Sequence, residues 1–207
     1  MSYAVKEIFL TLQGEGFHAG RVAVFCRFAG CNLWSGREAD RASAICRFCD
    51  TDFVGADAGR FASADHLAAA IDLLWPEGGQ KFVVFTGGEP LLQLDESLTM
   101  AMHRRGFEIA VETNGTIAPP PPGIDWLCVS PKAGSDWILR RGDELKLVVP
   151  QPGFDLDRLA QLPFRRFSLQ AMDGAEAAVN LAAAVELCHR HPAWRLSVQT
   201  HKMLGIR

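Results

Sequence analysis

Residues 81–105 read KFVVFTGGEPLLQLDESLTMAMHRR, and this stretch combines a strand, a glycine turn and a helix. The run 81–85 is apolar and rich in β-branched and aromatic residues, which is typical of a strand buried on both faces. The segment 86–90 (TGGEP) ends the strand and places proline where helices begin, so the pattern predicts a helix over 91–105. A strand that turns directly into a helix is the unit of an α/β fold.

The same alternation continues on both sides of this unit. Further strands are predicted at 22–29, 107–112, 126–129, 145–149, 167–170 and 195–199, and further helices at 63–75, 155–162 and 174–190. A complete eight-stranded barrel takes about 250 residues, whereas this chain has 207, and the four prolines of 116–123 (TIAPPPPG) exclude a crossover helix there. We therefore predict an α/β fold in one domain over residues 1–207: a partial, open barrel of about six mostly parallel strands with a reduced set of helices.

Composition excludes several classes of protein. The formal charge of −3 provides no bulk electrostatic reason to bind nucleic acid. The sequence contains no apolar run of membrane-spanning length, and its start, MSYAVKEIFL, lacks a basic region followed by an apolar one. We therefore expect a cytoplasmic protein with no membrane and no nucleic-acid partner.

Three cysteines lie close together in the run GCNLWSGREADRASAICRFCDT. Fourteen residues separate Cys31 from Cys46, and two separate Cys46 from Cys49. Close spacing without a signal peptide indicates metal or redox chemistry in a reducing compartment. Three thiolates can hold three irons of a four-iron cluster, which leaves one iron open to a small-molecule ligand. The alternatives are a zinc site with His18 or His66 as a distant fourth ligand, or unligated cysteines.

The other three cysteines lie in apolar surroundings. Cys26 is in VAVFCRFAG, Cys128 in DWLCVSP and Cys188 in the helical run AAAVELCHRH. Free cysteine commonly acts as a small buried apolar residue, and we predict that role for all three.

The cysteine run followed by Gly-Gly-Glu-Pro at the next strand end resembles the radical S-adenosylmethionine (SAM) superfamily. In that superfamily the open iron binds the amino and carboxylate groups of SAM. The usual spacing is three residues and then two, so the first gap here departs from the pattern, while Phe48 matches the aromatic residue that precedes the last cysteine. Gly87 and Gly88 let the backbone approach a ligand closely. The Glu89 carboxylate is expected to accept a charge-assisted hydrogen bond from the ammonium group of SAM.

Seven further segments narrow the resemblance from the superfamily to one family within it. They are 7–16 (EIFLTLQGEG), 25–28 (FCRF), 30–34 (GCNLW), 49–51 (CDT), 112–115 (ETNG), 130–132 (SPK) and 200–202 (THK). Together they are similar to the 7-carboxy-7-deazaguanine synthase family, some members of which have a long first cysteine gap. The similarity covers most of the chain.

This resemblance implies a magnesium-dependent carbon–nitrogen lyase of queuosine and 7-deazapurine biosynthesis. Reductive cleavage of SAM at the 4Fe–4S cluster yields a radical that removes the hydrogen at C6 of 6-carboxy-5,6,7,8-tetrahydropterin. The substrate radical rearranges, its ring contracts, ammonia is lost and SAM is regenerated, which leaves 7-carboxy-7-deazaguanine. The resemblance also implies a homodimer and an electron donor such as flavodoxin or ferredoxin.

The resemblance assigns roles to particular residues. For SAM it implies Phe48, Cys49, Asp50, Gly88, Glu89, Ser130, Pro131, Lys132, Gln170, Ala171, Met172 and Asp173, although family members often have proline in place of Ala171. For the pterin it implies Leu12, Gln13, Gly14, Arg27, Gly87 and Arg207. The contacts of Glu112, Thr113 and Asn114 are left open between a pocket wall and a structured turn.

Two of these assignments have a direct chemical reason and a simpler alternative. A guanidinium matches a carboxylate in two-point geometry, so Arg27 is the candidate for the substrate carboxylate; otherwise it is a paired arginine. Thr51 is the candidate magnesium ligand, because Mg²⁺ prefers oxygen donors and keeps waters or substrate oxygens in its shell. Otherwise the segment 50–52 forms a turn.

Two other functions fit parts of the pattern. A glycyl-radical activase is also a short radical SAM enzyme, but its substrate is a partner protein. A zinc-stabilised binding module would use the cysteines without catalysis. The TLQGEG and CDT segments argue for the pterin enzyme.

Overall fold

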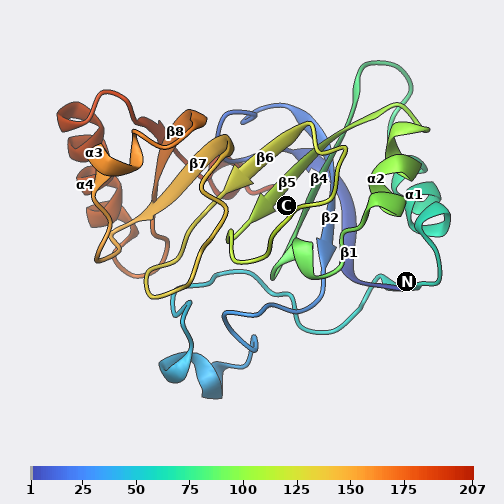
Figure 1. Ribbon diagram of the computed structural model, residues 1–207, viewed down its shortest axis with the longest axis horizontal. Helices are drawn as coiled ribbons and strands as arrows, with labels where there is room; N and C mark the ends of the chain where they lie inside the picture. The colour runs from blue at the N-terminus through green and yellow to red at the C-terminus, as the bar shows by residue number, and fades with distance from the viewer. Residues whose placement is uncertain (1) are drawn as a thin grey trace.

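The structure is a computed structural model, and it describes residues 2–207 (Figure 1). Its strands form one nine-stranded sheet in the order β3-β1-β2-β4-β5-β6-β7-β8-β9. The strands are β1 (Tyr3–Leu12), β2 (Val22–Phe28), β3 (Gly59–Phe61), β4 (Lys81–Gly87), β5 (Phe107–Thr113), β6 (Trp126–Val129), β7 (Gly142–Val149), β8 (Phe164–Ala171) and β9 (Arg195–Ser197). Within the described residues β3 and β9 are the two free edges, so the sheet is open.

The predicted open and mostly parallel sheet is confirmed. Neighbouring strands from β2 through β9 pair in parallel, and β1 runs antiparallel to β2 and to β3. All seven strand segments predicted from the sequence are present. The sheet has nine strands, more than the predicted total of about six, and β1 and β3 are the two strands that were not predicted. Most residues of β1 are half-buried on both faces, so the alternation that identifies a strand is weak. The three-residue β3 is too short to leave a pattern.

The helices are α1 (Ala64–Asp72), α2 (Glu96–His103), α3 (Leu156–Leu159), α4 (Ala177–Arg190) and α5 (Thr200–Leu204). Two 3₁₀ helices, η1 (Glu38–Ser43) and η2 (Pro90–Leu92), complete the set. The helix predicted at 91–105 is broken, because Asp95 accepts a hydrogen bond from the Leu98 backbone N–H at 3.0 Å and so caps a new helix. The proline run 116–123 contains no helix, as predicted.

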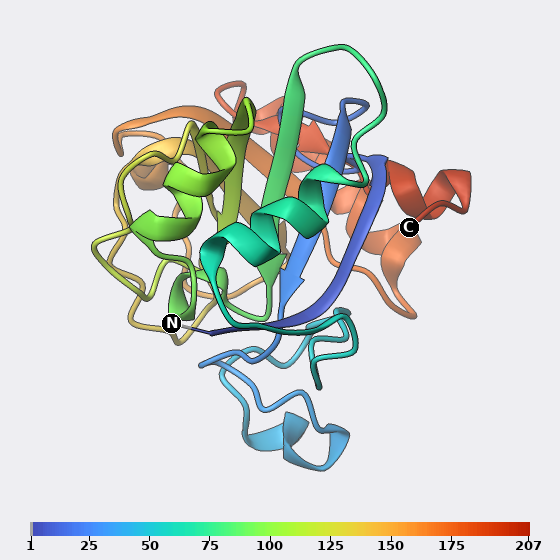
Figure 2. The same cartoon turned by 90° about the vertical axis from the view of Figure 1, so that its right-hand side faces the viewer.

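Helices α1, α2 and α4 pack in the main core against one face of the sheet, and we call this the outer face; the opposite, inner face forms the site. Figure 2 shows α1 and α2 side by side, and α4 packs against β8. On β7 the alternating side chains Leu145, Leu147 and Val149 join the main core, whereas Glu144 and Lys146 belong to the other face. This face of the sheet therefore carries buried polar side chains.

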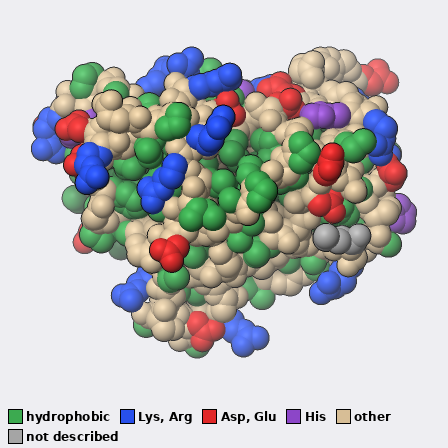
Figure 3. Space-filling view, viewed as in Figure 1, with side chains coloured by type: hydrophobic (Ala, Val, Ile, Leu, Met, Phe, Trp, Pro, Cys, Tyr) green, Lys and Arg blue, Asp and Glu red, His purple; other side chains and the backbone are tan. Residues whose placement is uncertain are grey.

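On the face in Figure 3, acidic and basic side chains are interspersed with hydrophobic ones. Among residues 2–207 there is no helix with the length and apolar character that a membrane span requires.

Candidate functional site

Two adjoining cavities lie where the parallel strands end. The cysteine cavity has a volume of about 170 Å³ and the outer cavity about 290 Å³. Ligands of barrel-like α/β folds occupy this end of the strands. Both cavities are lined by the same six residues at their junction: Glu15, Asp50, Thr51, Thr86, Glu112 and Gln199. A ligand in one cavity therefore lies next to a ligand in the other.

The three predicted cluster ligands, Cys31, Cys46 and Cys49, all line the cysteine cavity as free thiols. The thiol of Cys46 hydrogen-bonds to Cys49 and lowers the pKa of Cys49 to about 6, against the opposing effect of burial. In the described residues no three acidic, cysteine or histidine side chains converge to hold a single metal ion. Cluster cysteines bind separate irons and need not converge in that way. Three free thiols that line one cavity fit a cluster.

The histidines of the zinc alternative lie elsewhere. The His18 ring lies against Trp126, with ring centroids 4.5 Å apart. His66 is in the first turn of α1. Neither side chain lines the cysteine cavity.

The long insertion between the first two cysteines is anchored to the cysteine loop. Segment 32–53 projects from the body of the molecule in Figures 1 and 2. Arg41 of η1 donates to the backbone carbonyls of Arg47 at 3.0 Å and Cys49 at 3.1 Å. Its guanidinium lies 4.1 Å from the ring centroid of Trp34, which packs on Phe53. The insertion thus braces the loop that carries Cys46 and Cys49.

Gly87, the last residue of β4, and Gly88 allow the end of β4 to lie close to the segment that carries Cys31. A Cβ atom on Gly87 would lie 2.5 Å from the Phe28 carbonyl oxygen. One on Gly88 would lie 2.2 Å from the Gly30 carbonyl oxygen and 2.6 Å from the Cβ of Cys31. Both glycines line the cysteine cavity and pack closely against neighbouring protein atoms; their close approach to a ligand stays a prediction.

The protein itself holds the carboxylate of Glu89 in place. Its carboxylate is completely buried and accepts hydrogen bonds from Leu91 N at 2.9 Å, Thr113 Oγ1 at 2.8 Å and Asn114 N at 2.8 Å. Burial raises the pKa of Glu89. The side chain joins η2 to the end of β5 and is outside the lining of both cavities, while the neighbouring Gly88 lines the cysteine cavity. The expected contact between Glu89 and SAM stays a prediction. Thr113 and Asn114 make two of these hydrogen bonds, and they line the cysteine cavity together with Glu112.

The residues predicted for SAM gather around the cysteine cavity. They are Phe48, Cys49, Asp50, Gly88, Ser130, Lys132, Gln170, Ala171, Met172 and Asp173; Pro131 and Glu89 are outside the lining. Lys132 Nζ donates to the carbonyl oxygen of Ser130 at 2.6 Å and to its Oγ at 2.8 Å. Burial lowers the pKa of Lys132. The ends of β6 and β8 thus form one wall of this cavity.

The residues predicted for the pterin line the outer cavity, except Gly87, which lines the cysteine cavity. They are Leu12, Gln13, Gly14, Arg27 and Arg207, and Thr51 lies at the junction. Arg27 Nε donates to Glu7 Oε1 at 2.7 Å, and Glu7 also pairs with Arg207. The paired-arginine alternative is therefore present in the structure, together with a cavity beside the same side chain.

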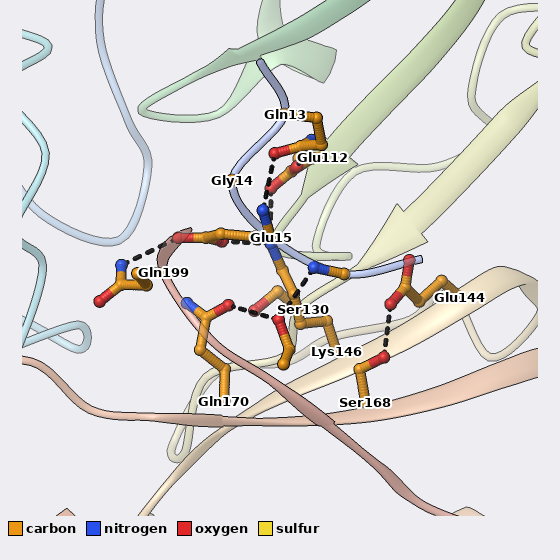
Figure 4. A network of polar contacts seen from close by, with 12 residues as sticks. Gln13, Gly14, Glu15, Glu112, Ser130, Glu144, Lys146, Ser168, Gln170 and Gln199 are labelled. Atoms are coloured by element: carbon orange, nitrogen blue, oxygen red, sulfur yellow. Dashed lines mark hydrogen bonds and ion pairs between the residues drawn. The ribbon is translucent and has the colours of Figure 1, made fainter. Parts of the chain in front are cut away.

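Sequence reasoning missed three site residues: Glu15, Lys146 and Gln199. Figure 4 shows them in a hydrogen-bonded network with Gln13 and Glu112. Glu15 belongs to the TLQGEG segment, in which only Leu12, Gln13 and Gly14 were assigned to the substrate. Lys146 was detectable as the one lysine in the otherwise apolar run 145–149 (LKLVV), since a charge buried there requires a partner.

The comparisons with known proteins agree with this geometry. The Radical SAM superfamily pattern matches residues 40–141, and this class of enzyme fits an open parallel sheet with three cysteines at its carboxyl end. The chain is 66% identical over 211 residues to 7-carboxy-7-deazaguanine synthase of Bradyrhizobium diazoefficiens and 60% identical over 210 residues to that of Bordetella pertussis. Each alignment covers 100% of both chains. The chain belongs to the 7-carboxy-7-deazaguanine synthase family.

A solved structure supports the fold. The crystal structure of QueE from Escherichia coli matches with a TM-score of 0.67 and 27% identity, covering 96% of this chain and 94% of that one. Membership of the radical SAM superfamily implies a 4Fe–4S cluster, SAM, a small-molecule substrate and a reductant.

Proposed function

We propose that this chain converts 6-carboxy-5,6,7,8-tetrahydropterin to 7-carboxy-7-deazaguanine with loss of ammonia. The observation that carries the proposal is the junction of the two cavities, which places a second, polar cavity directly beside the three cysteines. Similarity to the named synthases over the full chain supports this choice of substrate and product. When bound, the cluster and SAM supply the radical chemistry that starts the ring contraction. The protein binds and orients the reactants and excludes side reactions.

In this proposal Cys31, Cys46 and Cys49 hold the cluster. SAM lies in the cysteine cavity against the ends of β6 and β8. The pterin lies in the outer cavity, with its ring on the segment 12–14.

Arg27 is proposed to bind the carboxylate of the pterin. Its Nε is held by Glu7, and among the described residues its two terminal nitrogens make no side-chain hydrogen bond. The edge formed by these two nitrogens can donate two parallel hydrogen bonds to a carboxylate. Glu7 would then orient the guanidinium and leave this edge for the substrate.

Replacing Thr51 with alanine is expected to slow turnover by roughly 10- to 100-fold without loss of iron, because it removes one proposed oxygen ligand of Mg²⁺ and leaves all three cysteines. Initial rates measured over a range of magnesium concentrations should show a higher magnesium requirement. Ser43→Ala, a hydroxyl loss on η1 outside both cavities, is the control. Loss of the cluster in Thr51→Ala would instead make the threonine a support of the cysteine loop.

The chain is proposed to act as one domain, as a homodimer, in the cytoplasm. It would receive electrons from a flavodoxin or a ferredoxin, and its product would enter queuosine or another 7-deazapurine pathway.

The decisive experiment uses anaerobically reconstituted protein with SAM, reductant, Mg²⁺ and the carboxypterin. Mass spectrometry should detect 7-carboxy-7-deazaguanine and ammonia release in equal amounts. Protein with a full complement of iron that yields no product would overturn the proposed function.

A further inference from the structure

Lys146 is a buried cation at the middle of β7, and its side chain is only 4% exposed. Its Nζ donates to Glu15 Oε2 at 2.5 Å and to Glu112 Oε2 at 2.8 Å. A buried charge is strongly unfavourable unless it is paired and hydrogen-bonded. The lysine and its two carboxylates therefore form one unit, and removing one member changes the others.

Each carboxylate of this unit is also held from a second side. Gln13 Nε2 donates to Glu112 Oε1 at 2.8 Å, and Gln199 Nε2 donates to Glu15 Oε1 at 2.8 Å. Figure 4 shows Lys146 between the two carboxylates, with the glutamines on their far sides. These contacts fix both glutamates in orientation, and both line the two cavities at their junction.

The charges around the unit are unequal. Two carboxylates and one ammonium leave a net negative charge at the junction. Burial raises the pKa of Glu15, but Lys146 lowers it to about 2. Burial lowers the pKa of Lys146, but Glu112 and Glu15 raise it well above its usual value. Both groups thus carry their charges at neutral pH.

Other titratable groups also face this unit, and none of them replaces Lys146. They are Asp50 beside Gln199, Cys128 on β6, Lys132 after β6, Glu144 on β7 and His201 on α5. Glu144 accepts hydrogen bonds from Ser168 Oγ and from the Phe17 backbone N–H. Within residues 2–207, the only side-chain ion pairs of Glu15 and Glu112 are those with Lys146.

We propose that Lys146 is a positioning residue that holds Glu15 and Glu112 as two aligned acceptors for the N–H groups of a flat heterocyclic substrate. A carboxylate oxygen with one hydrogen bond retains capacity for another, so each glutamate can accept from a ligand in the outer cavity. The identity of that ligand as a carboxypterin rests on the proposed function. The arrangement of the three side chains does not depend on it.

Lys146→Met keeps an unbranched side chain that is one heavy atom shorter and removes its charge. We expect kcat/KM for the carboxypterin to fall about 100-fold, because displaced acceptors misplace the substrate. Iron content should match the wild type. Without the cation, burial raises the pKa of Glu15, so the acidic limb of the pH profile of kcat/KM moves to higher pH and activity is partly recovered on raising the pH. Lys146→Arg keeps a charge and should leave this limb near its original position.

Lys81→Met is the matched control. Lys81 is also a lysine on a parallel strand of the sheet, paired to Asp72 at 2.5 Å, and it lines neither cavity. Its replacement should leave kcat/KM and the pH profile unchanged.

A second measurement does not require substrate. Carbon-13 NMR of labelled glutamate carboxyl groups should show Glu15 ionised from pH 4 upward in the wild type and titrating at higher pH in Lys146→Met. Unchanged titration in a folded Lys146→Met would overturn this proposal. Failure of the wild type to form product would overturn the proposed function instead.

A charge-matched variant separates positioning from folding. Lys146→Met combined with Glu15→Gln removes one charge of each sign, so it is expected to fold and to bind iron even where the single variant does not. Its kcat/KM should remain well below that of the wild type. Recovery to the wild-type value would show that Lys146 is required only for folding and would contradict the proposal.

Discussion

Alanine in place of any one of Cys31, Cys46 and Cys49 is expected to abolish the iron–sulfur absorption and product formation together. The cysteine cavity is lined by only these three cysteines among the described residues, and a cluster with one open iron requires all three thiolates. After anaerobic reconstitution, the wild type should contain about four irons and four sulfides per chain. Each variant should contain little of either and give no detectable product.

Cys128→Ala is the control for this prediction. Cys128 is 4% exposed on β6 and lies outside the cysteine cavity, and burial raises the pKa of its thiol far above the usual value. Its replacement should retain iron and activity, at a loss of about 1 kcal/mol in stability for the missing sulfur contacts. If Cys128→Ala alone emptied the site, the assignment of the three ligands would be wrong. One zinc per chain in the wild type would likewise favour the structural-metal alternative.

Gly88→Ala is expected to abolish cluster binding and to lower stability by about 3 kcal/mol, because the added methyl group overlaps backbone atoms. The nearest of these is the Gly30 carbonyl oxygen, 2.2 Å from the new Cβ. No rotation of a side chain can relieve contact with a carbonyl, so the segment that carries Cys31 must move away from β4. Iron content and the midpoint of thermal unfolding measure the two effects separately.

Gly106→Ala provides a matched control. Gly106 has a φ of 79°, and a Cβ there would meet nothing within 4 Å. The substitution should cost only the penalty of a left-handed backbone, about 1–2 kcal/mol, and should leave the iron content unchanged. Equal iron content in the two variants would contradict the close packing inferred at Gly88.

Much of the fold could be predicted because its signals are local. A strand buried on both faces is a short apolar run, and seven such runs mark the parallel part of the sheet. The helix at 91–105 was predicted as continuous, since the competing cap at Asp95 depends on a side-chain orientation that periodicity does not describe. Strands β1 and β3 were missed because most residues of β1 are half-buried on both faces and the three-residue β3 is too short to leave a pattern.

Within the candidate site, short motifs identified residues that stay close together after folding. The cysteine run and the glycines after β4 line one cavity because their segments follow adjacent parallel strands, β2 and β4. Glu89 belongs to the same motif, yet its partners Thr113 and Asn114 are 24 and 25 residues away. The motif therefore gave the position of this glutamate in the chain, whereas these hydrogen-bond partners came only from the folded structure.

Residue types and short spacings are enough to show that strands alternate with helices, that three cysteines are available for one cluster, and which family the chain resembles. These properties depend on residue type and short spacing. The network of Glu15, Lys146 and Gln199 depends on contacts across 131 and 184 residues of chain. Such contacts form only when the sheet curves and brings its inner face and the C-terminal segment together, so this part of the site is a property of the folded chain.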